Sequence, residues 1–255
     1  MDEPNTPNIP VKSVVRMFEI VKVLQEMNGA TVTAIVERVE LSKSTVYNHL
    51  ATLERLEYVV RRKDEYHLSF RFLDHGGHAL SQDPRLRIVE PKIREIAAET
   101  DELCQFVIEE HGRGVIIFRE TGESAVETRI RLGSRLYLHH TTAGKAILSQ
   151  LPEERVEDIL ERHGLPGKTA KTITDPAVLH DELDRIEERG YASDKEEHIK
   201  GLHAVGVPVL DDDGVFGAIS VAGPSHRMGS ESQEREIADL ILGIANEVEL
   251  NISFL

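Results

Sequence analysis

Polar side chains that could contact DNA gather at the start of one predicted helix. Ser42 can cap a helix over residues 43–56, and side chains at a helix start can reach base edges in the major groove. Asn suits a bidentate contact with adenine, and Ser or Thr can contact a base or a phosphate. We expect this helix to face DNA with Ser42, Lys43, Ser44, Thr45, Tyr47, Asn48 and His49, and to bury Val46, Leu50, Leu53 and Leu56.

The elements around this helix predict a winged helix-turn-helix over residues 1–71. Apolar residues recur at helical spacing in two segments before it, and two short strands follow it. These elements are helices at 14–27 and 34–39, capped by Ser13 and Thr33, and strands at 58–62 and 66–70. The strands form a hairpin whose tip carries Arg61, Arg62 and Lys63, within reach of phosphates or the minor groove. A winged helix used only for protein contacts is the alternative.

A second group of residues suits a small acidic ligand. Residues 141–144 open a predicted helix, and the free N–H groups at a helix start bind carboxylates. Strands and helices alternate around it in an order that fits an antiparallel sheet with helices on it, which makes the chain an α+β protein. The expected helices are 89–100, 141–150, 153–163, 176–189 and a last one with Ser230 and Gln233 as a capping box; the expected strands are 103–109, 114–119, 136–139, 205–210 and 215–222.

The usual short catalytic motifs are absent from the chain, so we predict no catalytic residue and no cofactor. Gly144-Lys145 lacks the upstream Gly and the following Ser or Thr of a phosphate-binding loop. The one cluster that suggests a metal is His139, His140, His198 and His203. Adjacent histidines on a strand point to opposite faces, so we expect a pocket wall and an exposed residue there rather than a metal site.

The chain also lacks the sequence features of secretion and membrane insertion. A single cysteine, Cys104, excludes a disulfide framework. No apolar run approaches the roughly 18–20 residues of a membrane span, and the first ten residues have neither the basic start nor the apolar stretch of a signal peptide. We expect a cytoplasmic protein with no membrane partner.

The net charge of −15 is unevenly distributed. Residues 1–80 carry 10 basic and 11 acidic side chains, whereas residues 81–255 carry 20 and 34, and residues 43–63 form a small basic island. Acidity therefore does not exclude DNA as a partner. Since the chain has 20 Arg but only 10 Lys, we expect a salt-loving source; an ordinary acidic bacterial protein is the alternative.

Several short motifs follow one another along residues 12–250. They are Lys12 to Ile20, Leu41 to Val46, His49 to Leu53, Thr142 to Leu148, Glu188 to Ala192, Gly201-Leu202, Pro208-Val209, Ser220 to Pro224 and Arg227. In this order they resemble the IclR-type transcription regulators of bacteria and archaea. The order of many motifs makes this resemblance specific, which a helix-turn-helix match alone would not be.

The resemblance implies a linker helix at 72–88 that helps pair two chains, and a GAF-like effector-binding domain at 89–255. Within the linker, we expect Gly76-Gly77 and Pro84 to separate helical patches; a simple tether is the alternative. Arg16 joins the expected DNA contacts. The implied effector pocket is lined by Thr142, Ala143, Asp194, Leu202, Ala204, Ser220 and Ala222, for which core packing without a ligand is the alternative.

The chain departs from the family at two sets of positions. Glu40, Glu57 and Ser69 stand where the family often has Gly, which takes a positive φ freely, so these turns could be shaped differently. Ala204 and Ala222 stand where some members carry polar residues, which favours a larger or more apolar acid as ligand.

The predicted function is a transcription regulator that binds an operator in double-stranded DNA as a homodimer or a dimer of dimers. A small-molecule effector, such as an organic acid or another catabolic intermediate, would control this binding. In this family both repression and activation occur. The alternative is an enzyme or chaperone-like sensor that acts on a small acid and uses its winged helix for protein contacts only.

Overall fold

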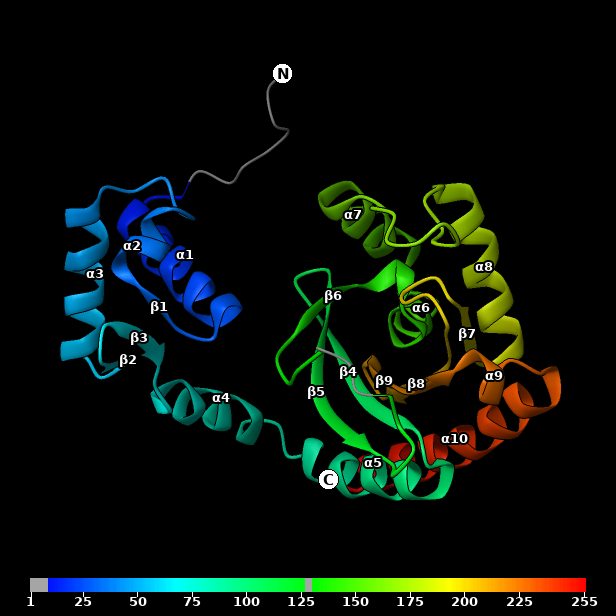
Figure 1. The fold of residues 1–255 in the computed structure, drawn as a ribbon. Helices are drawn as coiled ribbons and strands as arrows, with labels where there is room; N and C mark the ends of the chain where they lie inside the picture. The colour runs from blue at the N-terminus through cyan, green and yellow to red at the C-terminus, as the bar shows by residue number, and fades with distance from the viewer. Residues whose placement is uncertain (1–8, 127–129) are drawn as a thin grey trace. The chain divides into compact units, whose positions relative to one another are not determined.

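The computed structural model describes residues 9–126 and 130–255. Residues 1–8 and 127–129 lie outside the described part. The first of these ranges includes most of the ten residues in which the sequence showed no signal-peptide features. The chain divides into two compact units, residues 1–82 and 83–255, each with its own elements (Figure 1). Within the described residues, no helix is long and apolar enough to cross a membrane.

The first unit is a winged helix-turn-helix, which confirms the predicted fold. Its elements are α1 (Lys12–Met27), β1 (Ala30–Thr31), α2 (Val32–Val36), α3 (Lys43–Arg55), β2 (Val59–Arg62), β3 (Glu65–Leu68) and α4 (Arg71–Ser81). Its core is built from apolar residues of all three leading helices, among them Ile20, Leu24, Ile35, Val46 and Leu50. The wing is a three-stranded sheet in the order β1-β3-β2, because the unpredicted β1 pairs with β3.

Two of the predicted helix caps are wrong. α1 starts at Lys12, so Ser13 lies inside its first turn. Thr31 caps α2 in place of Thr33, since its hydroxyl oxygen accepts a hydrogen bond from the Ala34 N–H at 3.2 Å. The pairing of β1 with β3 holds Thr31 in an extended conformation, which is the backbone geometry of an N-cap.

Two other expectations for this unit also fail. Leu56 is 52 % exposed because α3 ends at Arg55 and the chain turns away at Glu57. α4 runs through Gly76 and Gly77 without a break, since neither glycine takes a positive φ and a helix tolerates glycine at a cost of about 1 kcal/mol each. The interruption falls after Ser81, near Pro84 as predicted, so the segment 72–88 is not one helix.

The second unit is a six-stranded antiparallel sheet between two layers of helices (Figure 1), which confirms the predicted class. The strand order is β6-β5-β4-β9-β8-β7. α5 and α10 pack on one face, and α6 packs on the other with α8 against it. The elements are α5 (Leu86–Thr100), β4 (Leu103–Glu110), β5 (Arg113–Thr121), β6 (Arg135–Tyr137), α6 (Thr142–Leu148), α7 (Glu153–His163), α8 (Pro176–Arg189), β7 (Ala192–Lys195), β8 (Leu202–Asp211), β9 (Gly214–Pro224), α9 (Ser225–Met228) and α10 (Glu231–Ile252).

The structure differs from the predicted elements of this unit in two respects. β7 and α9 have no counterpart in the sequence prediction. The strand expected at 136–139 ends at Tyr137, and Leu138–His140 form a 3₁₀ turn instead. The alternation of a strand therefore does not apply to His139 and His140, and both side chains are buried, in contrast to the expected exposed residue.

Candidate DNA interface and ligand cavity

The start of α3 is built as the sequence predicts. The Ser42 hydroxyl oxygen accepts a hydrogen bond from the Thr45 N–H at 3.2 Å, which caps the helix. It also lies 3.0 Å from the hydroxyl of Ser44 and 2.8 Å from that of Thr45. The three hydroxyls form one polar cluster at the exposed helix start, where they can exchange these contacts for a phosphate or a base.

The predicted DNA contacts on α3 lie on its exposed side, away from the buried Val46 and Leu50. Lys43 and Asn48 are exposed, Tyr47 is 56 % exposed, and Thr45 and His49 are partly covered. Arg16 is also exposed, but it belongs to α1, a different element of the same unit.

The tip of the wing uses one of its three basic residues for its own structure. Arg61 donates a hydrogen bond from Nε to the Lys63 carbonyl at 3.0 Å, and its guanidinium lies 5.7 Å from the centre of the Tyr66 ring. Lys63 takes a left-handed φ of 58° at the turn. Arg62 and Lys63 are exposed, so these two side chains are the ones placed to meet phosphates.

Of the three turns without the family's glycine, only one needs a positive φ. Glu57 has φ 64°, whereas Glu40 and Ser69 are not left-handed. A non-glycine residue in this region costs on the order of 1 kcal/mol. Arg71 offsets part of the cost, since its Nη1 donates to the Glu57 carboxylate at 3.0 Å and to the Leu56 carbonyl at 2.8 Å. The pair also neutralises the negative charge of Glu57.

In the second unit, all seven residues predicted for the effector pocket line one cavity. The cavity is partly open to solvent, and its empty volume with that opening included is about 540 Å³. Strand register explains how distant residues meet, since Leu103, Ala222, Ala204 and Asp194 are paired across β4, β9, β8 and β7. The full lining is Leu103, Gln105, Val107, Ile116, Ile130, Leu136, Thr141, Thr142, Ala143, Asp194, His198, Ile199, Leu202, Ala204, Ser220 and Ala222.

The start of α6 forms the wall opposite this part of the sheet. Thr141 caps α6 by accepting a hydrogen bond from the Gly144 N–H at 3.1 Å. Thr142 and Ala143 follow in the first turn and are buried against the cavity. Gly206 on β8 allows this approach, because a Cβ there would lie only 2.8 Å from the Thr142 side chain.

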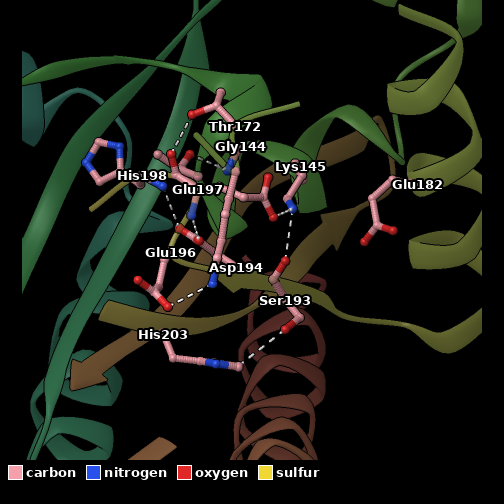
Figure 2. Close-up of polar contacts among 12 residues, drawn as sticks. Gly144, Lys145, Thr172, Glu182, Ser193, Asp194, Glu196, Glu197, His198 and His203 are labelled. Atoms are coloured by element: carbon pink, nitrogen blue, oxygen red, sulfur yellow. Dashed lines mark hydrogen bonds and ion pairs between the residues drawn. The ribbon is translucent and has the colours of Figure 1, made fainter. Parts of the chain in front are cut away.

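Asp194 is the buried carboxylate of the cavity. Its two oxygens accept hydrogen bonds from the backbone N–H groups of Glu197 at 2.6 Å and His198 at 3.3 Å (Figure 2). Burial nevertheless raises the pKa of Asp194 to about 6, since desolvation of the charge outweighs these hydrogen bonds and the nearby Lys145. The group can accept a hydrogen bond when ionised and donate one when protonated.

This shifted pKa predicts a pH-dependent stability difference. Because the pKa of Asp194 is higher in the folded chain than its ordinary 3.8, its contribution to the free energy of unfolding falls as pH rises from about 4 to about 6. Asp194→Asn removes the buried charge. The change that it causes in the free energy of unfolding should therefore be about 1–2 kcal/mol more favourable at pH 7.5 than at pH 4. Urea unfolding at both pH values measures this; equal effects at both would contradict it. The exposed Asp181→Asn is the control and should show no such difference.

The four histidines that were considered for a metal site, His139, His140, His198 and His203, do not converge on one point. His140 and His198 stack with ring centres 4.8 Å apart and Nδ1 atoms 3.0 Å apart. Burial lowers their pKa values to about 3 and about 4, so both are neutral at pH 7. His139 lies 3.2 Å from the Pro166 carbonyl, and His203 lies 3.3 Å from Glu234 of α10. Within the described ranges, no three His, Cys, Asp or Glu side chains are arranged to hold a metal ion.

Several cavity residues were not predicted. Three of them lie at alternate positions on β4, namely Leu103, Gln105 and Val107, and of these Gln105 is polar. The alternating strand pattern places these three on one face, but the sequence does not reveal that this face meets α6. His198 was considered only as a metal ligand, and it lines the cavity beside Asp194.

Comparison with known proteins gives consistent matches in both units. Residues 13–63 match the IclR helix-turn-helix domain, and residues 77–250 match the IclR C-terminal domain of bacterial transcriptional regulators. The probable HTH-type transcriptional regulator ArcR of Halobacterium salinarum is 28 % identical over 95 % of this chain and 94 % of its own length. The HTH-type transcriptional regulator KdgR of Escherichia coli is 31 % identical over 90 % and 89 %. The crystal structure of the Thermotoga maritima IclR matches with a TM-score of 0.78 at 29 % identity, covering 94 % of this chain and 98 % of that one.

Proposed function

Because this chain belongs to the IclR family of DNA-binding transcription regulators, whose C-terminal domain binds effectors, we propose that a small molecule in the cavity of the second unit controls operator binding by the first. The observation that carries the proposal is the cavity itself. It collects residues from α6, β4, β7, β8 and β9 and combines apolar walls with a buried carboxylate. The exposed, capped α3 supports the DNA half of the proposal.

The DNA contacts that we propose are those predicted from the sequence, with Ser42 acting also as the cap of α3. The effector contacts that we propose are the seven predicted residues of the cavity. We propose a chain that acts without catalysing a reaction, in the cytoplasm, where its operator would lie. The similarity to ArcR and KdgR, two transcriptional regulators matched over 94 % and 89 % of their lengths, supports this part.

We also propose that the chain works as a homodimer or a dimer of dimers in concentrated salt. Exposed apolar side chains on α1 and α4, among them Phe18 at 55 % and Leu73 at 70 %, support association of copies. The excess of acidic residues and the similarity to a Halobacterium salinarum regulator support a salt-loving source.

A mobility-shift experiment tests the proposed function. The full chain is mixed with the DNA upstream of its own gene and of neighbouring catabolic genes, in the presence and absence of candidate organic acids. We expect a discrete complex whose stability changes with one acid. No complex at any salt concentration, combined with turnover of an acid, would favour the enzyme alternative.

Asn48→Ala should relax the choice of operator. Loss of a bidentate base contact costs about 1–3 kcal/mol, so we expect operator affinity to fall about 5- to 150-fold while binding to unrelated DNA is kept. Arg62→Ala should instead weaken both kinds of DNA alike, because a phosphate contact carries no sequence information. Competitive mobility shifts measure both ratios. Arg94→Ala on α5 is the control for a lost exposed charge, and unchanged discrimination by Asn48→Ala would refute the placement of α3 in the groove.

A further inference from the structure

Arg85 is bound on several sides at the point where the chain enters the second unit. It is the third residue of that unit, and α4 ends at Ser81, four residues earlier. Its Nη1 pairs with the carboxylate of Asp211, the last residue of β8. Its Nε and Nη2 donate to the Asp83 carboxylate at 2.9 and 2.6 Å. The guanidinium thus ties the first residues after α4 to the end of a strand 126 residues further along the chain.

The guanidinium of Arg85 also lies over an aromatic ring of the neighbouring strand. Its central carbon is 4.0 Å from the centre of the Phe216 ring on β9, a cation–π contact. Phe216 is the extra residue of a β-bulge, because its neighbours Val215 and Gly217 pair with consecutive residues of β8. A bulge changes the direction of a side chain relative to the rest of its strand, and here the ring of the bulged residue meets Arg85.

Phe216 continues this contact to the strands of the cavity. Its ring centre lies 5.4 Å from that of Phe106 on β4, which is fully buried. Gly217 leaves room for Phe106, because a Cβ at position 217 would lie 2.6 Å from the tip of the Phe106 ring. Both chain neighbours of Phe106 line the cavity, as does Ser220 on β9. Arg85, Phe216 and Phe106 therefore form a row of contacts from the start of the second unit to the strands of the cavity.

We propose that Arg85 is a positioning residue that couples the cavity to the segment joining the two units. A change in β4 or β9 at the cavity shifts the two phenylalanine rings and the guanidinium above them, because densely packed side chains move together. Since Arg85 also holds Asp83, the chain that follows α4 shifts with it. This inference rests on the proposed function, because it requires that the second unit controls operator binding by the first.

Three variants of the full chain break this row of contacts in chemically different ways. Arg85→Gln removes a positive charge, Asp211→Asn removes a negative charge, and Phe216→Leu removes an aromatic ring without a change of charge. Each is titrated in mobility shifts, without any added acid, against the DNA upstream of its own gene and of neighbouring catabolic genes. Coupling between sites typically amounts to about 5- to 150-fold in affinity, so we expect all three variants to change operator affinity at least about fivefold and in the same direction.

The direction of the change separates coupling from a direct effect of charge on DNA binding. A charge effect would weaken operator binding in Arg85→Gln, strengthen it in Asp211→Asn and leave it unchanged in Phe216→Leu. Opposite directions, or a smaller change than expected in any of the three variants, would overturn the proposal. The double variant Arg85→Gln with Asp211→Asn should change operator affinity no more than the stronger single variant, because both break the same contact; additive effects would also overturn the proposal.

Arg87→Gln and Asp212→Asn are the matched controls, since both remove an exposed charge close to an altered position. Neither residue belongs to the row of contacts, so each variant should keep operator affinity within about twofold of wild type. Control variants that change it as strongly as Arg85→Gln and Asp211→Asn would overturn the proposal. Melting curves show which variants are folded at the temperature of the titration, and the three substitutions at different positions keep the test decisive if one of them does not fold.

Operator binding by the wild-type chain separates this inference from the proposed function. If the wild-type chain retards DNA and the three variants retard it equally well, Arg85 does not couple the two units and the proposed function stands. If the wild-type chain retards no DNA, the proposed function fails, and the coupling role of Arg85 fails with it.

Discussion

Lys145→Met is expected to lower the free energy of unfolding by about 3–5 kcal/mol. Lys145 on α6 is only 1 % exposed, and its Nζ donates to the Ser193 carbonyl at 2.9 Å and to Glu197 Oε1 at 2.6 Å (Figure 2). Removing the cation leaves the Glu197 carboxylate buried without its counter-charge. Urea unfolding of the full chain, followed by circular dichroism, measures the loss.

Two variants control for the loss of a lysine and for the loss of the pair. Lys171→Met removes an exposed cation that lies 2.8 Å from Glu196, the neighbour of Glu197, and should cost less than about 1 kcal/mol. The double variant Lys145→Met with Glu197→Leu removes both charges and should recover most of the stability, since apolar replacement of a buried pair is often neutral. A loss below about 1 kcal/mol for Lys145→Met would refute the account.

The pH dependence of this loss has a definite sign. Burial already raises the pKa of Glu197 above its ordinary value despite the neighbouring Lys145, and removing the cation raises it further. Glu197 can then take up a proton and avoid the buried charge at low pH. The cost of Lys145→Met should therefore be smaller at pH 5 than at pH 8.

The ion pair also connects two walls of the cavity. Lys145 belongs to the helix whose first turn carries Thr142 and Ala143, and Glu197 lies in the loop between Asp194 and His198. Thr172 holds the same loop, since its hydroxyl donates to the Glu197 carbonyl at 2.7 Å (Figure 2). A charge pair outside the cavity lining thus fixes the spacing of residues inside it.

Short sequence motifs predicted the elements that are stabilised by contacts between residues close together in the chain. Ser42 caps α3 as expected, because a serine before an apolar helical stripe satisfies the first free N–H groups wherever the helix packs. The capping box of Ser230 and Gln233 and the hairpin between β8 and β9 were predicted for the same reason. The two-domain order and the antiparallel class followed from the succession of such elements.

Long-range pairing decided what the sequence could not predict. β7 is Ala-Ser-Asp-Lys, a segment with little strand character, and it is extended because it pairs with β8. β1 is two residues long and is extended because it pairs with β3. This pairing makes Thr31, and not Thr33, the N-cap of α2. The sequence compared Lys145 only with the lysine of a phosphate-binding loop. It did not predict that Lys145 is buried, because the burial depends on a contact with a loop about 50 residues away.

The second large effect is expected at Gly144, where an alanine should lower the free energy of unfolding by about 3 kcal/mol, the upper end of the usual cost of overpacking. α6 packs directly on the 3₁₀ turn before it, and a Cβ on Gly144 would lie 2.5 Å from the Leu138 Cα, with the Leu138 carbonyl oxygen closer still. The obstacle is backbone, so no side-chain rotation relieves it, and α6 must move off the sheet.

Gly243→Ala in α10 is the matched control for this prediction, because both glycines lie within helices and only one is crowded. A Cβ on Gly243 meets nothing within 4 Å, so this variant should gain about 0.5–1 kcal/mol from reduced backbone freedom in the unfolded chain. In urea unfolding, alanine should thus lower the free energy of unfolding at position 144 and raise it at position 243.

Movement of α6 also displaces Thr142 and Ala143, so Gly144→Ala should lose the effector response even where it remains folded. A Gly144→Ala chain as stable as wild type would show that α6 does not rest on Leu138, and the cavity wall would then have to be placed differently.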